Sequence, residues 1–182
     1  LDVVGLGEPL IEFNECADGL FALSCGGDTS NCVIAAARLG SRCGYISRLG
    51  DDQFARLLRR QWDADNVDVT FVKTDEKAPT GIYFVTHGPG GHEFTYRREG
   101  SAASLMCPQD MPSSYIGGSR ILHVSGISQA ISQSASDSVL AAIESAKSSG
   151  TLVSYDTNLR LKLWPLKRAR EVIHETVRFA DI

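Results

Sequence analysis

Short apolar runs alternate along the chain with segments whose apolar residues recur at helical spacing. The apolar runs predict strands at residues 2–6, 45–47, 70–72, 121–124 and 152–155. Apolar residues recur at helical spacing in four segments, each of which predicts a helix. The first lies between Gly26-Gly27 and Gly40, and the second begins after Asp51-Asp52 and includes Trp62. The third runs from Val139 to a stop near Gly150, and the fourth covers residues 166–179. This alternation predicts an α/β fold in which helices flank a mostly parallel central sheet.

Two segments interrupt the alternation. Residues 81–86 and 93–97 are strand-like and flank Gly88-Pro89-Gly90-Gly91, which predicts a β-hairpin. Residues 10–13 and 20–23 predict a second pair of short strands around a turn. We therefore expect a small group of β-strands beside the main sheet.

Composition narrows the class of protein. The 182 residues are 43% hydrophobic and 22% charged, with a net charge of −4, as expected for one globular domain. No basic excess favours nucleic-acid binding. The apolar runs, such as residues 33–37, are far shorter than the ~20 residues that span a bilayer. We expect neither nucleic acid nor a membrane as a partner.

The five cysteines and the two ends of the chain suggest the compartment and the extent of the chain. The cysteine number is odd and no C-x-x-C spacing occurs, which favours reduced thiols and a cytoplasmic location. The chain opens on a strand without an initiator Met, and Asp181-Ile182 resembles the start of another strand. We expect a trimmed amino terminus and a protein that continues beyond Ile182.

Familiar nucleotide motifs are absent from the sequence. Gly5-Leu6-Gly7 follows a strand but lacks the third glycine and the helix of a dinucleotide fingerprint. No P-loop string occurs, and the four histidines show no metal-ligand spacing. The histidines are interpreted as ordinary surface or core residues.

The segment Gly26-Gly27-Asp28-Thr29-Ser30-Asn31 places two glycines and several small polar side chains at the start of a helix. Such a loop can bind hydroxyls or anionic oxygens through backbone N–H groups and side chains. It can equally be a loop with an ordinary N-cap from Asp28, Thr29 or Ser30. The position of Asn31 inside the first helical turns favours a ligand contact.

Several separate segments together resemble the ribokinase-like, or PfkB, carbohydrate kinases. The resemblance rests on residues 26–31, 35–40 and 47–52, and it extends over essentially the whole chain. Residues 5–8, 80–83, 96–103, 125–127 and 156–164 resemble in particular the 2-keto-3-deoxygluconate kinases of that family.

The resemblance implies a fold and a set of site residues. Residues 1–182 would be the amino-terminal part of a single ribokinase-like domain, with residues 9–24 and 80–98 forming a β lid. The lid and the glycine-rich loop would bind the sugar, and Asn158 and Arg160 would meet the nucleotide phosphates. The substrate-binding residues implied in this way are Gly27, Asp28, Asn31, Tyr83, Tyr96, Arg98, Ile127 and Arg160. Arginine pairs with both carboxylates and phosphates, which suits a sugar acid and ATP.

Most of these residues also have a simpler interpretation. Tyr83 and Tyr96 can be cross-strand packing partners in the hairpin. Arg97 and Arg98 point to opposite sides of a strand, so only one can enter the cleft, and the motif selects Arg98. Asp156 can cap the following turn.

Two acidic segments complete the candidates. Asp51-Asp52 is most economically a charge pair at a helix amino terminus rather than an acid–base couple. Glu8, at the end of the first strand, is a further candidate for contact with the sugar.

One family signature is missing from these 182 residues. No D-T-x-x-A-G-D-type string, which carries the catalytic aspartate and the anion hole, occurs in the chain. We expect the base to lie beyond Ile182, so that this segment alone contains no catalytic residue and has little or no activity.

The resemblance predicts ATP-dependent phosphorylation of a sugar acid, 2-keto-3-deoxygluconate, to its 6-phosphate, with Mg²⁺. A fructokinase or another sugar kinase of the family is the alternative within the class, and a non-catalytic sugar-acid binding module is the alternative outside it. Exposed lid strands favour a homo-oligomer formed through the lid.

Overall fold

Five parallel strands form the centre of the computed structural model, which describes the backbone of residues 1–182 and every side chain except that of Asp18. The strand order is β5-β4-β1-β8-β9, so the first strand of the chain lies in the middle of the sheet. The bounds are Val3–Leu6 for β1, Cys43–Gly50 for β4, Asp68–Asp75 for β5, Ile121–Ser125 for β8 and Leu152–Asp156 for β9.

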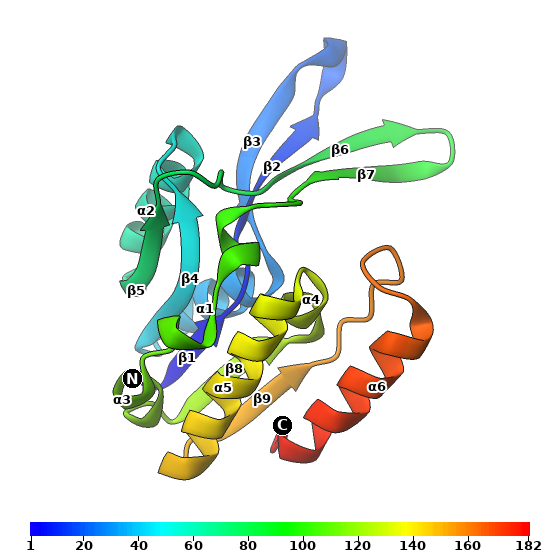
Figure 1. Ribbon diagram of the computed structural model, residues 1–182. Helices are drawn as coiled ribbons and strands as arrows, with labels where there is room; N and C mark the ends of the chain where they lie inside the picture. The colour runs from blue at the N-terminus through cyan, green and yellow to red at the C-terminus, as the bar shows by residue number, and fades with distance from the viewer.

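A second, four-stranded sheet, which we call the lid, projects from the carboxyl ends of the central strands (Figure 1). Its order is β3-β2-β6-β7. The two outer pairs are antiparallel, whereas β2 and β6 are parallel and join segments that lie far apart in the sequence. The bounds are Leu10–Glu15 for β2, Phe21–Gly26 for β3, Ile82–Gly88 for β6 and Gly91–Arg97 for β7.

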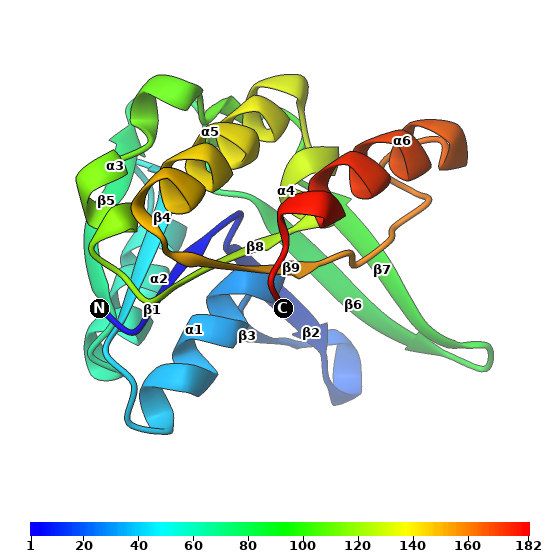
Figure 2. The ribbon, with the colours of Figure 1, turned by 90° about the horizontal axis from the view of Figure 1, so that it is seen from below.

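Helices cover both faces of the central sheet (Figure 2). Helices α1 (Asp28–Arg38) and α2 (Gln53–Ala64) lie on one face. The other face carries α3 (Ser113–Gly117), α5 (Gln133–Ser149) and α6 (Leu166–Thr176), while the short α4 (Gly126–Ala130) follows β8 directly. The described helices of the chain include none long and apolar enough to cross a lipid bilayer.

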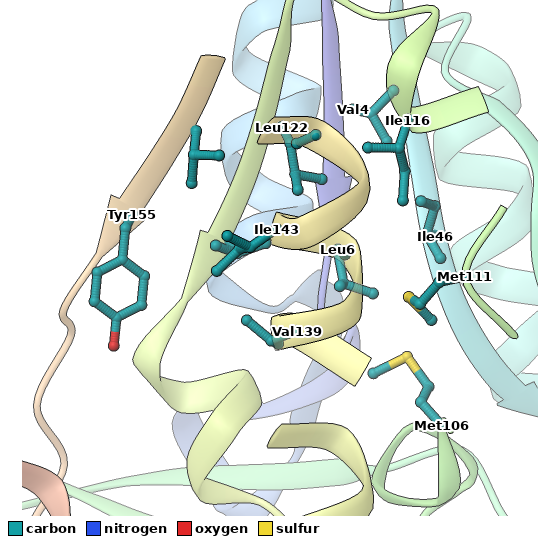
Figure 3. Packing of buried hydrophobic residues seen from close by; sticks show 14 of the residues in the cluster. Val4, Leu6, Ile46, Met106, Met111, Ile116, Leu122, Val139, Ile143 and Tyr155 are labelled. Carbon is teal, nitrogen blue, oxygen red and sulfur yellow. The ribbon is translucent and has the colours of Figure 1, made fainter. Parts of the chain in front are cut away.

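Each face of the sheet has its own hydrophobic core. On one side Val139 and Ile143 of α5 pack with Leu6 and Leu122 of the central strands (Figure 3). On the other side Trp62 of α2 packs with residues of α1 and β4. Strands buried on both faces read as continuous apolar runs, which explains why the sequence of the central strand β1 predicts a strand.

The predicted elements are present, with changed bounds. Strands β4 and β5 extend beyond the predicted residues 45–47 and 70–72. The predicted helix 166–179 is an α-helix only to Thr176 and continues as a 3-10 turn. Residues 181–182 are not a strand, although the N–H groups of both donate to the Val153 carbonyl oxygen at 2.8 and 3.2 Å. The short helices α3 and α4 were not predicted, because segments of this length show no periodicity.

Asp52 connects the central sheet to the root of the lid. Its Oδ1 atom accepts the Ala55 N–H at 2.8 Å and caps α2, while Oδ2 accepts the Thr80 N–H at 2.8 Å just before β6. Burial alone would raise the pKa of Asp52, but the N–H donors of Thr80 and Ala55 outweigh it and lower the pKa. The carboxylate therefore stabilises the fold in its charged form.

We predict that Asp52→Ala lowers the free energy of unfolding at pH 7 by about 2 kcal/mol, because a helix cap and a charge-assisted hydrogen bond are both lost. Asp51→Ala, at an exposed neighbour, should cost less than about 0.5 kcal/mol. Chemical denaturation measures both.

The difference between wild type and Asp52→Ala should depend on pH. A lowered pKa in the folded state gives stability that is fully present above the unfolded carboxyl pKa of about 3.9 and is lost as pH falls through the folded value. Repeating the denaturation series between about pH 5 and pH 2 should make the two stabilities converge. A constant difference over that range would contradict the assignment.

Candidate functional site

The carboxyl ends of β1, β8 and β9 lie side by side beneath the lid. Glu8 follows β1, whereas Ser125 ends β8 and Asp156 ends β9. This edge is where open α/β sheets bind their ligands. Polar side chains from three strands therefore converge on one region.

Asp28, the first residue of α1, joins this edge to the loop after β9. Its Oδ2 atom accepts hydrogen bonds from the Ser125 hydroxyl and, at 3.0 Å, from the Asn158 side-chain amide. Asn158 has a φ of 33°, in the left-handed region that asparagine tolerates, and its N–H donates to Asp156 Oδ1 at 3.0 Å. Asp28 thus fixes where the loop of residues 157–163 begins.

Close packing and a positive φ require glycine at Gly27, and Gly26 packs against Tyr83. Gly27 has a φ of 113°, and a Cβ atom there would lie 2.7 Å from the Glu8 carbonyl oxygen. A Cβ atom on Gly26 would lie 2.8 Å from the Tyr83 hydroxyl. Gly27 is the N-cap of α1 and provides no side-chain cap, so the alternative of an N-cap at Asp28, Thr29 or Ser30 is wrong, although Asp28 Oδ1 accepts the Thr29 N–H at 2.8 Å. Thr29 and Ser30 are instead buried and bond to Tyr45 and Trp62.

Glu8 lies beneath the lid and forms an ion pair with Arg98. Its side chain is fully buried and accepts hydrogen bonds from the Arg98 guanidinium and, at 2.6 Å, from the Ser101 hydroxyl. Burial raises the pKa of Glu8, and Arg98 and Ser101 oppose that rise. Glu8 does not line the cavity described next, but it bonds to Arg98, which does.

A cavity of about 480 Å³ lies between the lid hairpin, α4 and the loop after β9. Its wall combines aromatic, aliphatic and cationic side chains, and the described lining contains no carboxylate. The lining residues are Phe94, Tyr96, Arg98, Ile127, Leu159, Arg160, Leu161, Lys162 and Leu163. Such a wall suits a ligand that carries negative charge.

The cationic groups of the cavity differ in whether a carboxylate of the protein already pairs with them. Arg98 is held by Glu8, and its carbon Cζ lies 5.4 Å from the centre of the Tyr96 ring. Arg160 is exposed and forms no salt bridge with any described carboxylate, its recorded bond being to the Leu159 carbonyl oxygen at 3.2 Å. Lys162 is exposed as well. Arg160 and Lys162 are thus the cavity cations that are not held by a described carboxylate.

Tyr83 and Tyr96 are cross-strand partners whose rings stack at 5.4 Å between centroids. The Tyr83 hydroxyl donates to Glu12 Oε2, and burial, together with Glu12, raises the pKa of Tyr83. Tyr83 and Tyr96 are therefore the cross-strand packing partners that the simpler interpretation predicted, and Tyr96 also lines the cavity.

The structure brings some predicted site residues together and separates others. Tyr96, Arg98, Ile127 and Arg160 line one cavity. Asp28 and Asn158 adjoin it through the loop after β9, and Tyr83 adjoins it through its ring contact with Tyr96. Gly27 packs on the backbone at Glu8.

Asn31 does not reach that cavity. It is exposed and lines a different groove, between α1, α2 and β3, together with Ile34 and Arg38. The position of Asn31 in the first helical turns predicted a ligand contact. In this structure, however, Asn31 lines a different groove from the one that Arg98 and Arg160 line.

The remaining alternatives are resolved by hydrogen bonds and exposure. Asp156 accepts the N–H of Asn158 and so caps a turn, and Asp52 caps α2. Arg97 is exposed and lies by a groove beside Asp52 and Phe54. Arg98, selected by the motif, is the arginine of the pair that enters the cavity.

Sequence reasoning missed the cavity roles of Phe94 and Lys162. Phe94 alternates with Tyr96 along β7, which places both on one face of the strand. Arg160 and Lys162 have the same spacing in a single loop. Both pairs were present as signals, but neither identifies a cavity until the hairpin and the loop are seen to face each other.

The residues fit an anionic nucleotide better than a tightly held metal ion. The described residues contain no group of three or more His, Cys, Asp or Glu side chains arranged to hold a metal. Arg160 and Lys162 can meet phosphate oxygens, whereas the amide of Asn158 donates to Asp28. Mg²⁺ commonly binds through one or two carboxylates together with substrate phosphates, which requires no such cluster.

Comparison with known proteins matches residues 3–182 to the family model described as pfkB family carbohydrate kinase. The chain is 39% identical to 2-dehydro-3-deoxygluconokinase of Thermoproteus tenax, over 98% of this chain and 57% of that protein. It is 35% identical to probable fructokinase-7 of Arabidopsis thaliana, over 99% of this chain and 55% of that protein. The chain thus spans somewhat more than half the length of these relatives.

Solved structures give the same fold. An uncharacterized sugar kinase from Pyrococcus horikoshii in complex with ATP matches with a TM-score of 0.90 at 27% identity. The match covers 98% of this chain and 61% of that chain. The central sheet and the lid are therefore arranged as in that kinase.

We predict that Arg98→Gln lowers the free energy of unfolding by about 3 kcal/mol, because it leaves the buried Glu8 carboxylate without its partner. The double variant Glu8→Gln/Arg98→Gln should recover at least half of that loss, since the unpaired charge is then gone. Urea denaturation at pH 7 measures both.

Arg97→Gln is the matched control for this series and should change stability by less than about 0.5 kcal/mol. A double variant whose loss equals the sum of the two single losses would show that Glu8 and Arg98 are not coupled.

Proposed function

The chain belongs to the pfkB family of carbohydrate kinases, and we propose that its protein phosphorylates the sugar acid 2-keto-3-deoxygluconate on its 6-hydroxyl, with ATP as the phosphate donor. The Thermoproteus tenax relative is named 2-dehydro-3-deoxygluconokinase, and 2-dehydro-3-deoxygluconate is another name for 2-keto-3-deoxygluconate. The sequence segments at residues 96–103, 125–127 and 156–164 support the same substrate.

The observation that carries the proposal is the charge of the cavity wall. Arg98, Arg160 and Lys162 line it, and no described carboxylate does. With a neutral sugar such as fructose these cations can pair only with Glu8 and the ATP phosphates, whereas a keto acid adds a planar carboxylate that a guanidinium binds through two hydrogen bonds. The wall therefore favours an acidic sugar.

In this proposal the sugar lies between the lid and the edge of the central sheet. Tyr83 and Tyr96 cover its ring or chain, Ile127 packs against its carbon skeleton, and Arg98 and Arg160 bind its carboxylate. Gly27, Asp28 and Asn31 bind its hydroxyls, which for Asn31 requires a change from the groove that it lines here. Arg160 and the amide N–H of Asn158 that is not donated to Asp28 meet the nucleotide phosphates.

The proposed reaction transfers one phosphoryl group. The 6-hydroxyl oxygen bonds to the γ-phosphorus, the bond from that phosphorus to the bridging oxygen breaks, and ADP leaves. The hydroxyl proton passes to an aspartate that we expect beyond Ile182. Mg²⁺ bound to ATP would neutralise phosphate charge. The contribution of the present residues is to orient the sugar and stabilise negative charge.

Fructokinase activity is the second candidate. Plant proteins named fructokinases are 35% identical to the chain over up to 99% of its length, nearly as similar as the Thermoproteus tenax protein. A fructokinase needs no free guanidinium to bind its neutral sugar. A variant that removes a free guanidinium of the cavity therefore distinguishes the two proposals.

We predict that the full-length protein phosphorylates 2-keto-3-deoxygluconate in preference to fructose and ribose, in an assay of ADP release with ATP and Mg²⁺. Arg160→Gln should raise KM for the keto acid at least about tenfold, since a hydrogen bond to a charged group contributes ~1.5–3 kcal/mol. Arg160 suits this test better than Arg98, because it has no described acidic partner whose burial its loss would leave uncompensated.

Arg97→Gln is the control, and we expect its KM for the keto acid to equal that of the wild type. Preference for fructose in the wild type would replace the sugar-acid proposal with a fructokinase. Binding of the keto acid without turnover of any sugar would replace it with a binding module.

We also propose that the protein forms a homo-oligomer through its lid and resides in the cytoplasm. Strand β3 is an edge strand, and Leu20, Phe21 and Leu23 at it are 69%, 38% and 51% exposed. Edge strands with apolar side chains commonly pair with another chain. The described cysteines are free thiols, as suits a reducing compartment.

We predict that Leu23→Glu shifts the full-length protein toward monomer in light scattering coupled to size-exclusion chromatography, because it places a charge in the proposed interface. Leu39→Glu, at an exposed leucine outside the lid, is the control and should leave the mass unchanged. An unaltered mass in Leu23→Glu would remove β3 from the interface.

A further inference from the structure

Two histidines face each other at the tip of the lid hairpin. His87 of β6 and His92 of β7 are register partners on either side of the turn. Their Nδ1 atoms lie 2.7 Å apart, and their ring planes are inclined by 82°. Both side chains are exposed. Nothing in the proposed kinase reaction uses them.

A chain of hydrogen bonds fixes the orientation of His87. The Asn14 side-chain amide donates to Glu12 Oε1 at 3.0 Å, which turns the Asn14 carbonyl oxygen toward His87. That oxygen accepts the N–H of His87 Nε2 at 2.8 Å. A neutral His87 therefore carries its proton on Nε2 and presents a lone pair on Nδ1, and the Nδ1 proton between the rings belongs to His92.

This arrangement is the one that metal-binding histidines adopt. A histidine ligand typically donates its second ring N–H to an oxygen, which fixes the tautomer and increases the basicity of the other nitrogen. Asn14 does this for His87. Moving the His92 proton to Nε2 frees both Nδ1 lone pairs with no net loss of a proton from the neutral pair. Small rotations of the two exposed rings then turn these lone pairs from each other toward one shared ion.

The separation of the two nitrogens selects a class of metal ion. With metal–nitrogen bonds of about 2.05 Å, adjacent positions of a square or octahedron need nitrogens about 2.9 Å apart, whereas a tetrahedron needs about 3.3 Å. The observed 2.7 Å is the length of the hydrogen bond between the rings, and it lies nearer the first value than the second. Cu²⁺ and Ni²⁺ prefer square-planar or tetragonal coordination by such ligands.

The surroundings of the pair favour a cation. Residues 10–26 and 82–96, which form nearly the whole lid, contain no Lys or Arg. Glu15 lies beside the pair, since its Oε2 atom accepts the backbone N–H of His87 at 3.1 Å. No basic residue of the lid strands up to Tyr96 therefore competes with a bound cation.

We propose that His87 and His92 form a surface binding site for a divalent transition-metal ion with square-planar or octahedral preference, of which Cu²⁺ and Ni²⁺ are the probes. The protein provides the two Nδ1 atoms, and water completes the coordination, since the described residues offer no third ligand in a cluster. The bound ion crosslinks β6 to β7 across the turn. Through Asn14 and Glu12 the site is joined by hydrogen bonds to Tyr83.

The test uses the full-length protein, purified without a histidine tag, and titrates it with Cu²⁺ under calorimetry and electron paramagnetic resonance. We expect a site with one ion per chain and a spectrum that shows two imidazole nitrogens. His87→Gln and His92→Gln should each weaken its affinity at least tenfold and reduce the nitrogen pattern. Ni²⁺ titration should show the same dependence on both residues.

Two further variants separate the site from non-specific binding. Asn14→Ala removes the oxygen that orients His87 and should weaken binding about 10-fold or more, as loss of such partners does elsewhere. His174→Ala changes an exposed histidine on α6 and should leave the affinity unchanged. Equal affinities and spectra for wild type, His87→Gln and His92→Gln would overturn the proposal, whatever the sugar specificity of the enzyme.

Discussion

The buried ion pair between Glu8 and Arg98 determines how the two sheets of this protein are connected. Glu8 follows the central strand β1, and Arg98 follows the last lid strand β7. A carboxylate removed from water is costly unless a cation and further donors surround it, and Arg98 and Ser101 meet that need. The buried Glu8 carboxylate needs Arg98 beside it, and this need fixes where the lid hairpin returns to the central sheet.

Other features of the site follow from this connection. Gly27 can approach the backbone at Glu8 only because it lacks a Cβ atom, and this approach places Asp28 at the edge of the sheet. Asp28 in turn holds Asn158 and the loop that carries Arg160. One buried pair, one glycine and one aspartate thus bring together a hairpin, a helix and a loop. The cationic cavity is the space that they leave.

The sequence predicted the α/β class, the hairpin and the membership of a kinase family, because periodicity and short motifs are local properties. It also selected Arg98 over Arg97, although only through the motif. It did not reveal that Glu8 is the partner of Arg98, since the two residues lie far apart and no periodicity links them. The same limit applies to Asn31, whose helix was predicted but whose facing depends on how α1 packs against α2. Short helices such as α4 escape prediction because they lack a full period.

The central position of β1 has a consequence for how the chain folds. Val3 is paired with Cys43 on one side and with Ile121 on the other, so β1 is completed by a strand that is made about 120 residues later. At synthesis rates of ~5–20 residues per second, about 120 residues separate the two events by roughly 6–24 s. During that interval one edge of an apolar strand is open to wrong partners. Sheets of such high contact order also fold slowly. The edge of β1 that later pairs with β8 therefore needs protection from other strands during that interval.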